Sequence, residues 1–413
     1  MSRITAALAL ASVAIACGPG PVVRHGAINQ PALTSIEQGL QGVRGLRFTA
    51  PVPGRVLDQA GVAALIRSEL DREYHPGDLE RLSAVYGRLG LLPPGTSLRP
   101  LLEQLYGDQI AALYDPRTKT LALASGALDD RPLSIRVMGF LTGRDVLGEM
   151  LVAHELTHAL QDQHFGLPTT APPITNADGD RLIARRALLE GDATLASIAY
   201  VRGGDLDQAT VLQVLEEVAG IPDELAARFP DIPEVIRTGL AFQYNQGTSF
   251  AAAAYLRGGW RAVDDAERDP PASTEQVLHH QKYFDERDPP AQITLGGTDE
   301  LERRSWTPIV EDTLGELDVR ILLATVAPQT AAGAAAGWAG DRFRALARGD
   351  DVTVVWLTVW DTPADASEFA GALPPVLPAA GIERRESRVL VTIGPAAGTI
   401  APRVWSRSTV RAS

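Results

Sequence analysis

The sequence predicts an α+β protein with a mainly helical first part and a mixed C-terminal part. Apolar residues recur at helical spacing over 57–106 and again, with breaks at prolines, over 146–260. Two short alternating segments, 110–114 and 120–124, lie between these regions and indicate a β-hairpin. Near the C-terminus the apolar run VTVVWLTVW, residues 352–360, is typical of a buried strand. Helices and strands are therefore expected to be largely separate along the chain.

The composition is that of a globular protein, with 45% hydrophobic and 22% charged residues among 413. This length is enough for two or three domains with a sizeable core. The formal net charge of −13 argues against a nucleic-acid partner and against binding of anionic membrane through a basic face.

The first 17 residues are typical of an export signal. Arg3 is followed by an apolar run over 4–16 that is too short to span a bilayer. The run ends in AIAC, which resembles the lipid-attachment site of bacterial lipoproteins, and Cys17 is the only cysteine in the chain. We therefore expect an exported protein held to the membrane by lipid on Cys17, with Gly18 favouring the outer membrane. The alternative is an ordinary cleaved signal with an incidental cysteine.

Changes in composition divide the rest of the chain into three parts. Residues 18–42, rich in Gly and Pro at their start, are expected to be a tether, 43–300 the main domain, and 301–413 a C-terminal α+β domain. The expected elements are, in order, a strand over 43–53, helices over 57–73, 78–89 and 97–106, the hairpin, helices over 146–165 and 178–200, broken helices from 206 to 260, a helix over 313–326, a tightly packed helix over 329–338, the strand 352–360, a helix over 363–373 and a strand over 388–393.

The motif HELTH, His154 to His158, carries the strongest chemical signal. Positions i and i+4 of a helix lie on one face, so both imidazoles can reach one ion. Glu155 stands next to the first histidine, where its carboxylate can contact a water without binding the ion. This division of roles is what zinc-peptidase chemistry requires. The alternative is two histidines at the edge of the core with ordinary hydrogen bonds.

Two residues compete to be the third metal ligand. His164 matches the spacing HExxHxxGxxH, but Gln161 stands where that pattern needs a helix-breaking glycine, and no methionine follows the motif. Glu190 lies on the next helical segment. We expect Glu190 to be the ligand and Gly191 to allow close approach to the helix of the HELTH motif, because a glycine inside a helix destabilises it by about 1 kcal/mol. Otherwise Glu190 is an ordinary surface carboxylate.

An HExxH motif followed by a glutamate from a later helix resembles the gluzincin group of zinc peptidases. The resemblance departs from that group's ExxxD pattern because Thr194 stands in place of the aspartate. The segments HELTHALQDQHF, LLEGDAT, PPASTEQVLHHQKY and AAAGWAGDRF also resemble a group of largely uncharacterised bacterial lipoproteins with a gluzincin-like core, over about 43–369. The resemblance implies a zincin-like fold, Zn²⁺ as cofactor, and a sheet before the active helix whose edge strand pairs with extended substrate.

The resemblance also implies a Tyr or His, after the third ligand, that donates a hydrogen bond to the oxyanion of the reaction. The candidates are His279 first, Tyr244 second and Tyr283 third. The alternative is that all three only support the fold.

Together these observations predict a zinc metallopeptidase that is located in the bacterial cell envelope and acts on a peptide or protein substrate. Zinc is expected on His154, His158 and Glu190, with Glu155 as the general base. One alternative is a lipoprotein that binds metal without catalysis. The other is a zinc amide hydrolase that acts on cell-wall peptides.

Overall fold

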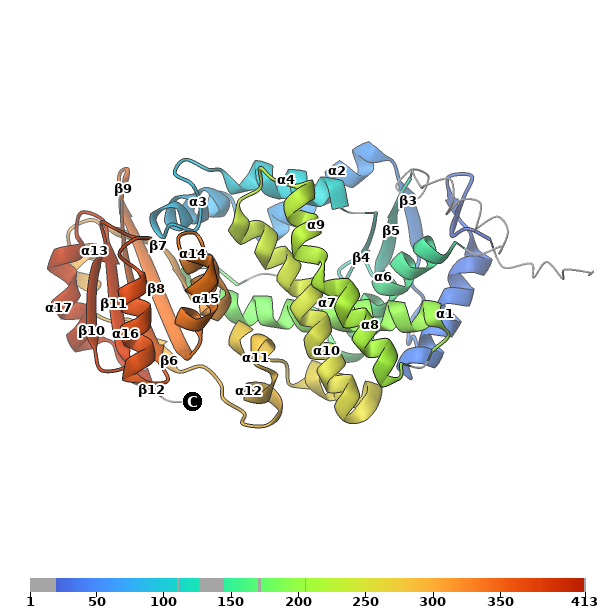
Figure 1. Cartoon of the computed structure of the whole chain (residues 1–413). Helices are drawn as coiled ribbons and strands as arrows, with labels where there is room; N and C mark the ends of the chain where they lie inside the picture. The colour runs from blue at the N-terminus through green and yellow to red at the C-terminus, as the bar shows by residue number, and fades with distance from the viewer. Residues whose placement is uncertain (1–19, 110, 126–144, 170–171, 205, 412–413) are drawn as a thin grey trace, which may run out of the picture.

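The computed structural model describes residues 20–109, 111–125, 145–169, 172–204 and 206–411, which run from a small sheet through a helical middle to a larger sheet (Figure 1). The α+β class is confirmed. The predicted export signal and the lipid attachment at Cys17 lie outside the described residues. Within the described ranges, every helix is too short or too polar to span a membrane.

The N-terminal part carries a three-stranded sheet and four helices. Its elements are β1 (Val23–Arg24), β2 (Ala27–Ile28), α1 (Gln30–Arg44), β3 (Gly54–Leu57), α2 (Gln59–Glu73), α3 (Asp78–Arg88), α4 (Leu98–Gln109), β4 (Ala112–Asp115) and β5 (Thr120–Ala124). The strand order is β3-β5-β4, with β3 parallel and β4 antiparallel to β5. The predicted hairpin is thereby confirmed, and β4 lies at an edge of this sheet.

The expected tether over 18–42 is wrong. Residues 23–28 form the short β1–β2 hairpin, and α1 follows it. Leu33, Ile36 and Leu40 give α1 an apolar face that is buried in the core around the HELTH helix. Gly26, with φ 74°, lies in the turn of that hairpin, so this part of the segment is folded.

The expected strand over 43–53 is also wrong. Gly45 ends α1 with a left-handed backbone, φ 69°, and the chain is irregular until β3 begins at Gly54. Pro51 and Pro53 have no amide hydrogen to donate to a neighbouring strand, which explains why pairing starts only after them.

The middle of the chain is helical. Its elements are α6 (Val146–Phe165), the 3₁₀ turn η1 (Ile174–Asn176), α7 (Gly179–Arg202), α8 (Gln208–Ala219), α9 (Ile221–Arg228), α10 (Glu234–Arg268), α11 (Thr274–Leu278) and α12 (His280–Phe284). The HELTH helix α6 begins at Asp145, whose side chain accepts from the amide of Gly148, and ends at Gly166. The helices expected to end near residue 260 continue to Arg268, because α10 only kinks at Gly258 and Gly259.

Two glycines bring α7 and α10 into direct contact. A Cβ on Gly191 of α7 would lie 2.0 Å from the carbonyl oxygen of Gly247 on α10, and a Cβ on Gly247 would lie 2.0 Å from that of Ala187. The expectation that Gly191 serves close approach to α6 is therefore wrong, because its partner is α10. Since Glu190 precedes one glycine and Tyr244 lies one turn before the other, this crossing sets the distance between those two side chains.

The C-terminal part is a five-stranded antiparallel sheet with helices on both faces. Its elements are β6 (Gln292–Thr294), α13 (Asp299–Glu302), β7 (Thr307–Asp312), α14 (Gly315–Ala324), α15 (Pro328–Ala335), β8 (Trp338–Arg348), β9 (Asp351–Trp360), α16 (Pro363–Ala372), β10 (Gly381–Arg385), β11 (Arg388–Ile393), α17 (Ala397–Arg407) and β12 (Thr409–Arg411). The order is β10-β11-β9-β8-β7. Alternate residues of β9 enter two different cores, so the prediction of a buried strand is confirmed.

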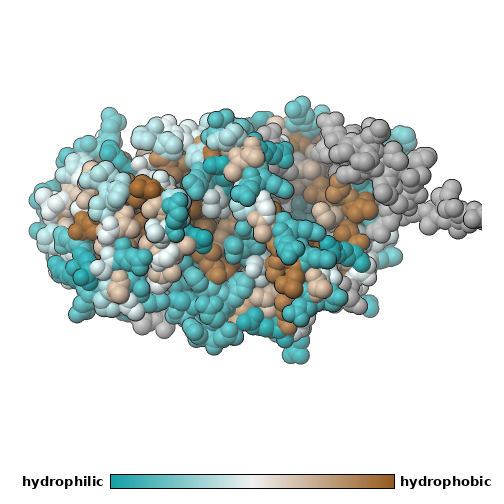
Figure 2. All heavy atoms as spheres, in the orientation of Figure 1, coloured by the Kyte–Doolittle hydropathy of each residue, from teal (hydrophilic) through white to brown (hydrophobic). Residues whose placement is uncertain are grey.

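This sheet is joined to the helical middle through buried carboxylates. Asp312 of β7 accepts from the amide of Gly179 at the start of α7. Thr274 of α11, whose hydroxyl donates to the buried Asp180, accepts from the amide of Leu317 in α14. The face visible in Figure 2 is mostly hydrophilic, with hydrophobic residues in separate groups over the helical middle and over the C-terminal part.

Candidate metal centre and active site

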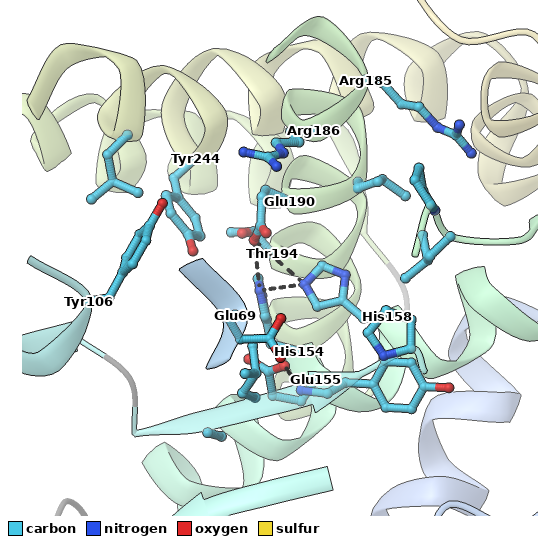
Figure 3. Close-up of a pocket in the computed structure, with 18 of the residues that line it drawn as sticks. Glu69, Tyr106, His154, Glu155, His158, Arg185, Arg186, Glu190, Thr194 and Tyr244 are labelled. Carbon is cyan, nitrogen blue, oxygen red and sulfur yellow. Dashed lines mark hydrogen bonds and ion pairs between the residues drawn. The ribbon is translucent and has the colours of Figure 1, made fainter. Parts of the chain in front are cut away.

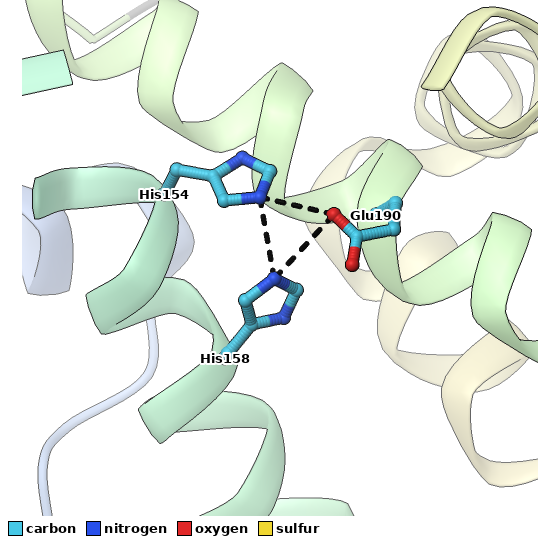
Figure 4. A group of neighbouring side chains, drawn as sticks. All are labelled: His154, His158 and Glu190. Atoms are coloured by element: carbon cyan, nitrogen blue, oxygen red, sulfur yellow. Dashed lines mark hydrogen bonds and ion pairs between the residues drawn. The ribbon is translucent and has the colours of Figure 1, made fainter. Parts of the chain in front are cut away.

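Three side chains converge on one point between α6 and α7 (Figure 4). Nε2 of His154 lies 3.0 Å from Oε2 of Glu190 and 3.2 Å from Nε2 of His158, and the latter lies 3.6 Å from the same Oε2. Zinc bonds of about 2.0–2.2 Å at tetrahedral angles separate the ligand atoms by about 3.3–3.5 Å. The spacing of the three donors therefore fits a zinc ion. Among the described residues, this is the one group of three or more His, Cys, Asp or Glu side chains close enough to share a metal.

A buried amide orients the second histidine. Nδ1 of His158 lies 2.8 Å from Oε1 of Gln161, an atom that can only accept, so Nδ1 carries a hydrogen. In the neutral ring, Nε2 is then the nitrogen with a lone pair for a metal. Nε2 of Gln161 donates to Oδ2 of Asp192 and to the carbonyl oxygen of Leu189, each at 3.0 Å. These acceptors fix which end of the amide faces the histidine.

Asp192 is held in turn by Arg44 at the end of α1. Nη2 of Arg44 donates to Oδ2 of Asp192 at 3.1 Å and to Asp264 at 2.8 Å, and Arg44 is almost fully buried. Asp192 thus supports the metal ligands through Gln161. Thr194, at the position of the gluzincin aspartate, lines the cavity, and its hydroxyl has no hydrogen-bond partner within the described part of the chain.

The charges of the metal-free centre are tightly linked. Burial would lower the pKa of His158, but the neighbouring charge of Glu190 raises it to about 10. Burial would raise the pKa of Glu190, but His158 and His154 hold it well below its usual value. The carboxylate therefore keeps a proton on the histidine pair when no metal is bound, and a metal must displace that proton.

Glu155 is tied to the sheet beside the three donors. Its Oε2 accepts a hydrogen bond of 2.7 Å from the backbone amide of Tyr114 on β4, and the residue lines the same cavity as the histidines. The tyrosine itself is fixed because its hydroxyl donates to Asp162 at 2.7 Å, and Asp162 also accepts from Lys119 at 2.6 Å. The edge strand thus holds one carboxylate oxygen in place beside the metal ligands.

Tyr244 reaches the centre from α10 (Figure 3). Its ring centroid lies 6.2 Å from that of His154. The charge of Glu190, followed by burial, raises the pKa of Tyr244 well above the usual value, so the phenol stays protonated and remains a hydrogen-bond donor. Tyr106 of α4 lines the same side of the cavity, and burial raises its pKa as well.

The prediction that His279 is the first candidate for the oxyanion donor is wrong. His279 lies between α11 and α12, where its Nε2 is 2.9 Å from Glu316 of α14, and it does not line the cavity. Tyr283 donates to the carbonyl oxygen of Asp269 at 2.6 Å and also lies outside the cavity. The α11–α12 segment packs toward the C-terminal part, away from the metal centre.

The two candidates for the third ligand lie in different surroundings. His164 has its Nε2 2.8 Å from the carbonyl oxygen of Arg47 and is not part of the cluster, because α6 continues straight through Gln161. Glu190 takes the position that the sequence predicts for it.

The centre opens into a cavity of about 600 Å³, hereafter the main cavity. Its walls come from α2, α4, β4, α6, α7, α10 and residues 167–169. This volume is within the range of ligand-binding clefts. Tyr106, Arg186 and Glu69 also line it (Figure 3), and they were not predictable from the sequence because no local pattern distinguishes them from other helical side chains.

Comparison with known proteins gives one partial match. Residues 305–411 match a family described as Domain of unknown function (DUF8575). No curated protein and no solved structure matches the chain. The matched segment covers the C-terminal sheet and contains none of the residues of the metal centre.

Proposed function

We propose that the protein is a zinc-dependent peptidase, exported and anchored through lipid on Cys17. The observation that carries the proposal is the convergence of His154, His158 and Glu190 at zinc spacing, with the carboxylate of Glu155 in the same cavity. Zinc on these three residues would supply a Lewis acid for the scissile carbonyl and lower the pKa of a water molecule.

Glu155 is suited to move the proton of that water. The amide of Tyr114 fixes one carboxylate oxygen, which leaves the other for the attacking water. A carboxylate placed in this way accepts the proton as the water attacks and returns it to the leaving amine.

Tyr244 is suited to stabilise the oxyanion. The phenol is protonated, lines the main cavity and lies beside both Glu190 and His154. A donor aimed at the place where negative charge develops acts mainly on the transition state.

The edge strand β4 is suited to bind an extended peptide. The amide of Ala124 donates to the carbonyl oxygen of Ala111 at 2.9 Å, which marks that pair as hydrogen-bonded. Because hydrogen-bonded and non-bonded pairs alternate, Ala112 and Tyr114 direct their amides and carbonyls away from β5. The bond from the Tyr114 amide to Glu155 agrees with this parity. Main-chain groups facing the cavity give affinity for peptides with little dependence on sequence.

Metal analysis of purified protein, paired with digestion of unfolded casein and of a peptide library, tests the proposal. We expect one zinc per chain, its loss in Glu190→Ala, its retention in the control His164→Ala, and cleavage by the zinc-loaded wild type. Full zinc in Glu190→Ala with loss in His164→Ala would overturn the ligand set. Bound zinc without cleavage of any peptide would indicate a metal-binding protein, and cleavage confined to cell-wall peptides would indicate the amide hydrolase.

A further inference from the structure

A second cavity of about 240 Å³, hereafter the second chamber, adjoins the main cavity. The side chains that line both are Glu73, Tyr106, Leu182, Arg186 and Leu240. Arg186 lies one helical turn before Glu190 on α7 and forms an ion pair with Glu73. The shared wall therefore carries a neutralised pair and does not present a net positive charge to a ligand that passes it.

The second chamber has apolar walls and an acidic end. Leucine and isoleucine are the most frequent residues of the lining, and nearly all of them come from α3, α4, α7 and α10. The charged residues on the lining are four carboxylates against the single guanidinium of Arg186; the carboxylates are those of Glu73, Asp178, Asp312 and Asp318. Its electrostatic preference is thus for a cation, although its surface is mainly apolar.

Asp318 is the residue that points to a ligand. It is only 7% exposed, it lines the second chamber, and its carboxylate has no hydrogen-bond or ion-pair partner among the residues that the structure describes. Its neighbour Asp312 is different, because it accepts from the amides of Gly179 and Thr313 at 2.6 and 2.8 Å. A buried carboxylate without a partner destabilises the fold unless it is protonated or meets a donor.

Burial, helped by the charges of Asp312 and Asp341, raises the pKa of Asp318 to about 7. Tyr86 also lines the second chamber, and its hydroxyl has no hydrogen-bond partner among the residues described. The acidic end therefore combines a carboxylate and a phenol that both remain available to a ligand.

We propose that the second chamber binds a cationic group on an apolar stem, an ammonium or guanidinium of the peptide substrate, through Asp318. Lysine and arginine side chains have this form, with a hydrocarbon stem that packs on leucine and a charged end. The free amino terminus of a peptide offers the same charge. The substrate role rests on the proposed peptidase function.

The geometry sets how far this group lies from the scissile bond. Gly179 marks the acidic end of the chamber, because its amide donates a hydrogen bond to Asp312. At 1.5 Å per residue, Gly179 lies about 16 Å from Glu190 along α7. An extended peptide advances about 3.4 Å per residue. A span of about 16 Å corresponds to about five residues of extended backbone, so the cationic group belongs to a residue up to about five positions from the bond that is cut.

The test is calorimetric titration of zinc-loaded Glu155→Gln with acetylated hexapeptides of alanine and leucine that carry one lysine, norleucine or glutamate at each position in turn. Because this variant is used for binding alone, the result does not depend on cleavage, which casein digestion by the wild type reports separately. At one position we expect the lysine peptide to bind about tenfold or more tightly than the norleucine peptide, because the lysine gains one charge-assisted hydrogen bond. Adding Asp318→Asn should reduce the ratio to about threefold or less.

The matched control is Asp223→Asn, which removes one exposed carboxylate of α9 outside the second chamber. It should leave the lysine preference unchanged, and melting curves should show both variants folded. Unacetylated norleucine peptides separate the sources: the same Asp318-dependent gain there would assign the chamber to the chain terminus. Equal binding of lysine and norleucine everywhere, tightest binding of glutamate, or an unchanged preference in Asp318→Asn would overturn the proposal.

Discussion

Replacement of Gln161 by methionine should weaken zinc binding without removing a metal ligand. Gln161 is fully buried. Among the residues that the structure describes, it is the one that accepts a hydrogen bond from Nδ1 of His158. Methionine has nearly the same length but cannot hold the ring or fix its tautomer. Loss of such a supporting contact typically costs about 10–100-fold in metal affinity or activity, which is about 1.4–2.7 kcal/mol.

The zinc dissociation constant, measured by competition with a chelator, checks this expectation. The matched control is Gln213→Met on α8, where the glutamine is exposed and pairs with Arg202 away from the centre. The control should keep the wild-type dissociation constant. A Gln161→Met protein that is folded and binds zinc within about twofold of wild type would refute the role that we assign to the Gln161 contact.

Three further predictions address the helix contact, the oxyanion and the proton on the histidines. Gly191→Ala should destabilise the protein by about 2 kcal/mol or more in denaturant unfolding, because the new Cβ meets the backbone of Gly247. The control Gly371→Ala has open space around the new Cβ and should be neutral or slightly stabilising. Tyr244→Phe should lower kcat about a hundredfold in steady-state assays while zinc content stays normal, and an unchanged kcat would remove Tyr244 from the mechanism. Burial lowers the pKa of His158 and the charge of Glu190 raises it, with a result of about 10. The protonated form therefore stabilises the metal-free protein fully below the unfolded pKa of about 6.5, and this stabilisation is lost as pH rises through about 10. Because zinc must displace that proton, zinc affinity should rise about tenfold per pH unit between 7 and 9, and an affinity independent of pH would contradict the displacement.

The placement of the two histidines proposed as ligands was predictable because the information is local. Helical spacing alone places His154 and His158 on one face, and the structure keeps them there. Gly191 signalled a close helix contact, but the sequence did not say which helix makes it. The partner is α10, through Gly247, and a contact between such distant segments has no local signature.

The supporting contacts were not predictable for the same reason. The path from Gln161 through Asp192 to Arg44 joins three helices, and none of these residues has an unusual neighbourhood in the sequence. His279 was ranked above Tyr244 because its segment resembles the lipoprotein group, whereas the helix crossing decides which of them reaches the cavity.

The C-terminal sheet shows the limit for strands. β9 was predictable from its apolar run, but β8 was not. Asp341 interrupts the apolar pattern of β8, and it is accommodated because the indoles of Trp338 and Trp356 donate to it at 2.9 and 3.1 Å. The Ala/Gly-rich helix predicted to reach Trp338 ends at Ala335, and Gly337 turns the chain into the strand with φ 80°.

The central claim is that Glu155 acts on a water beside a zinc ion held by the other three residues. Its most direct test is the turnover of unfolded casein by zinc-loaded Glu155→Gln relative to wild type, with zinc content measured on the same sample. Glutamine can still accept from the amide of Tyr114 but cannot take a proton from water. We expect one zinc per chain and a loss of turnover of at least about a hundredfold. Turnover near that of the wild type, with the zinc still bound, would contradict the account.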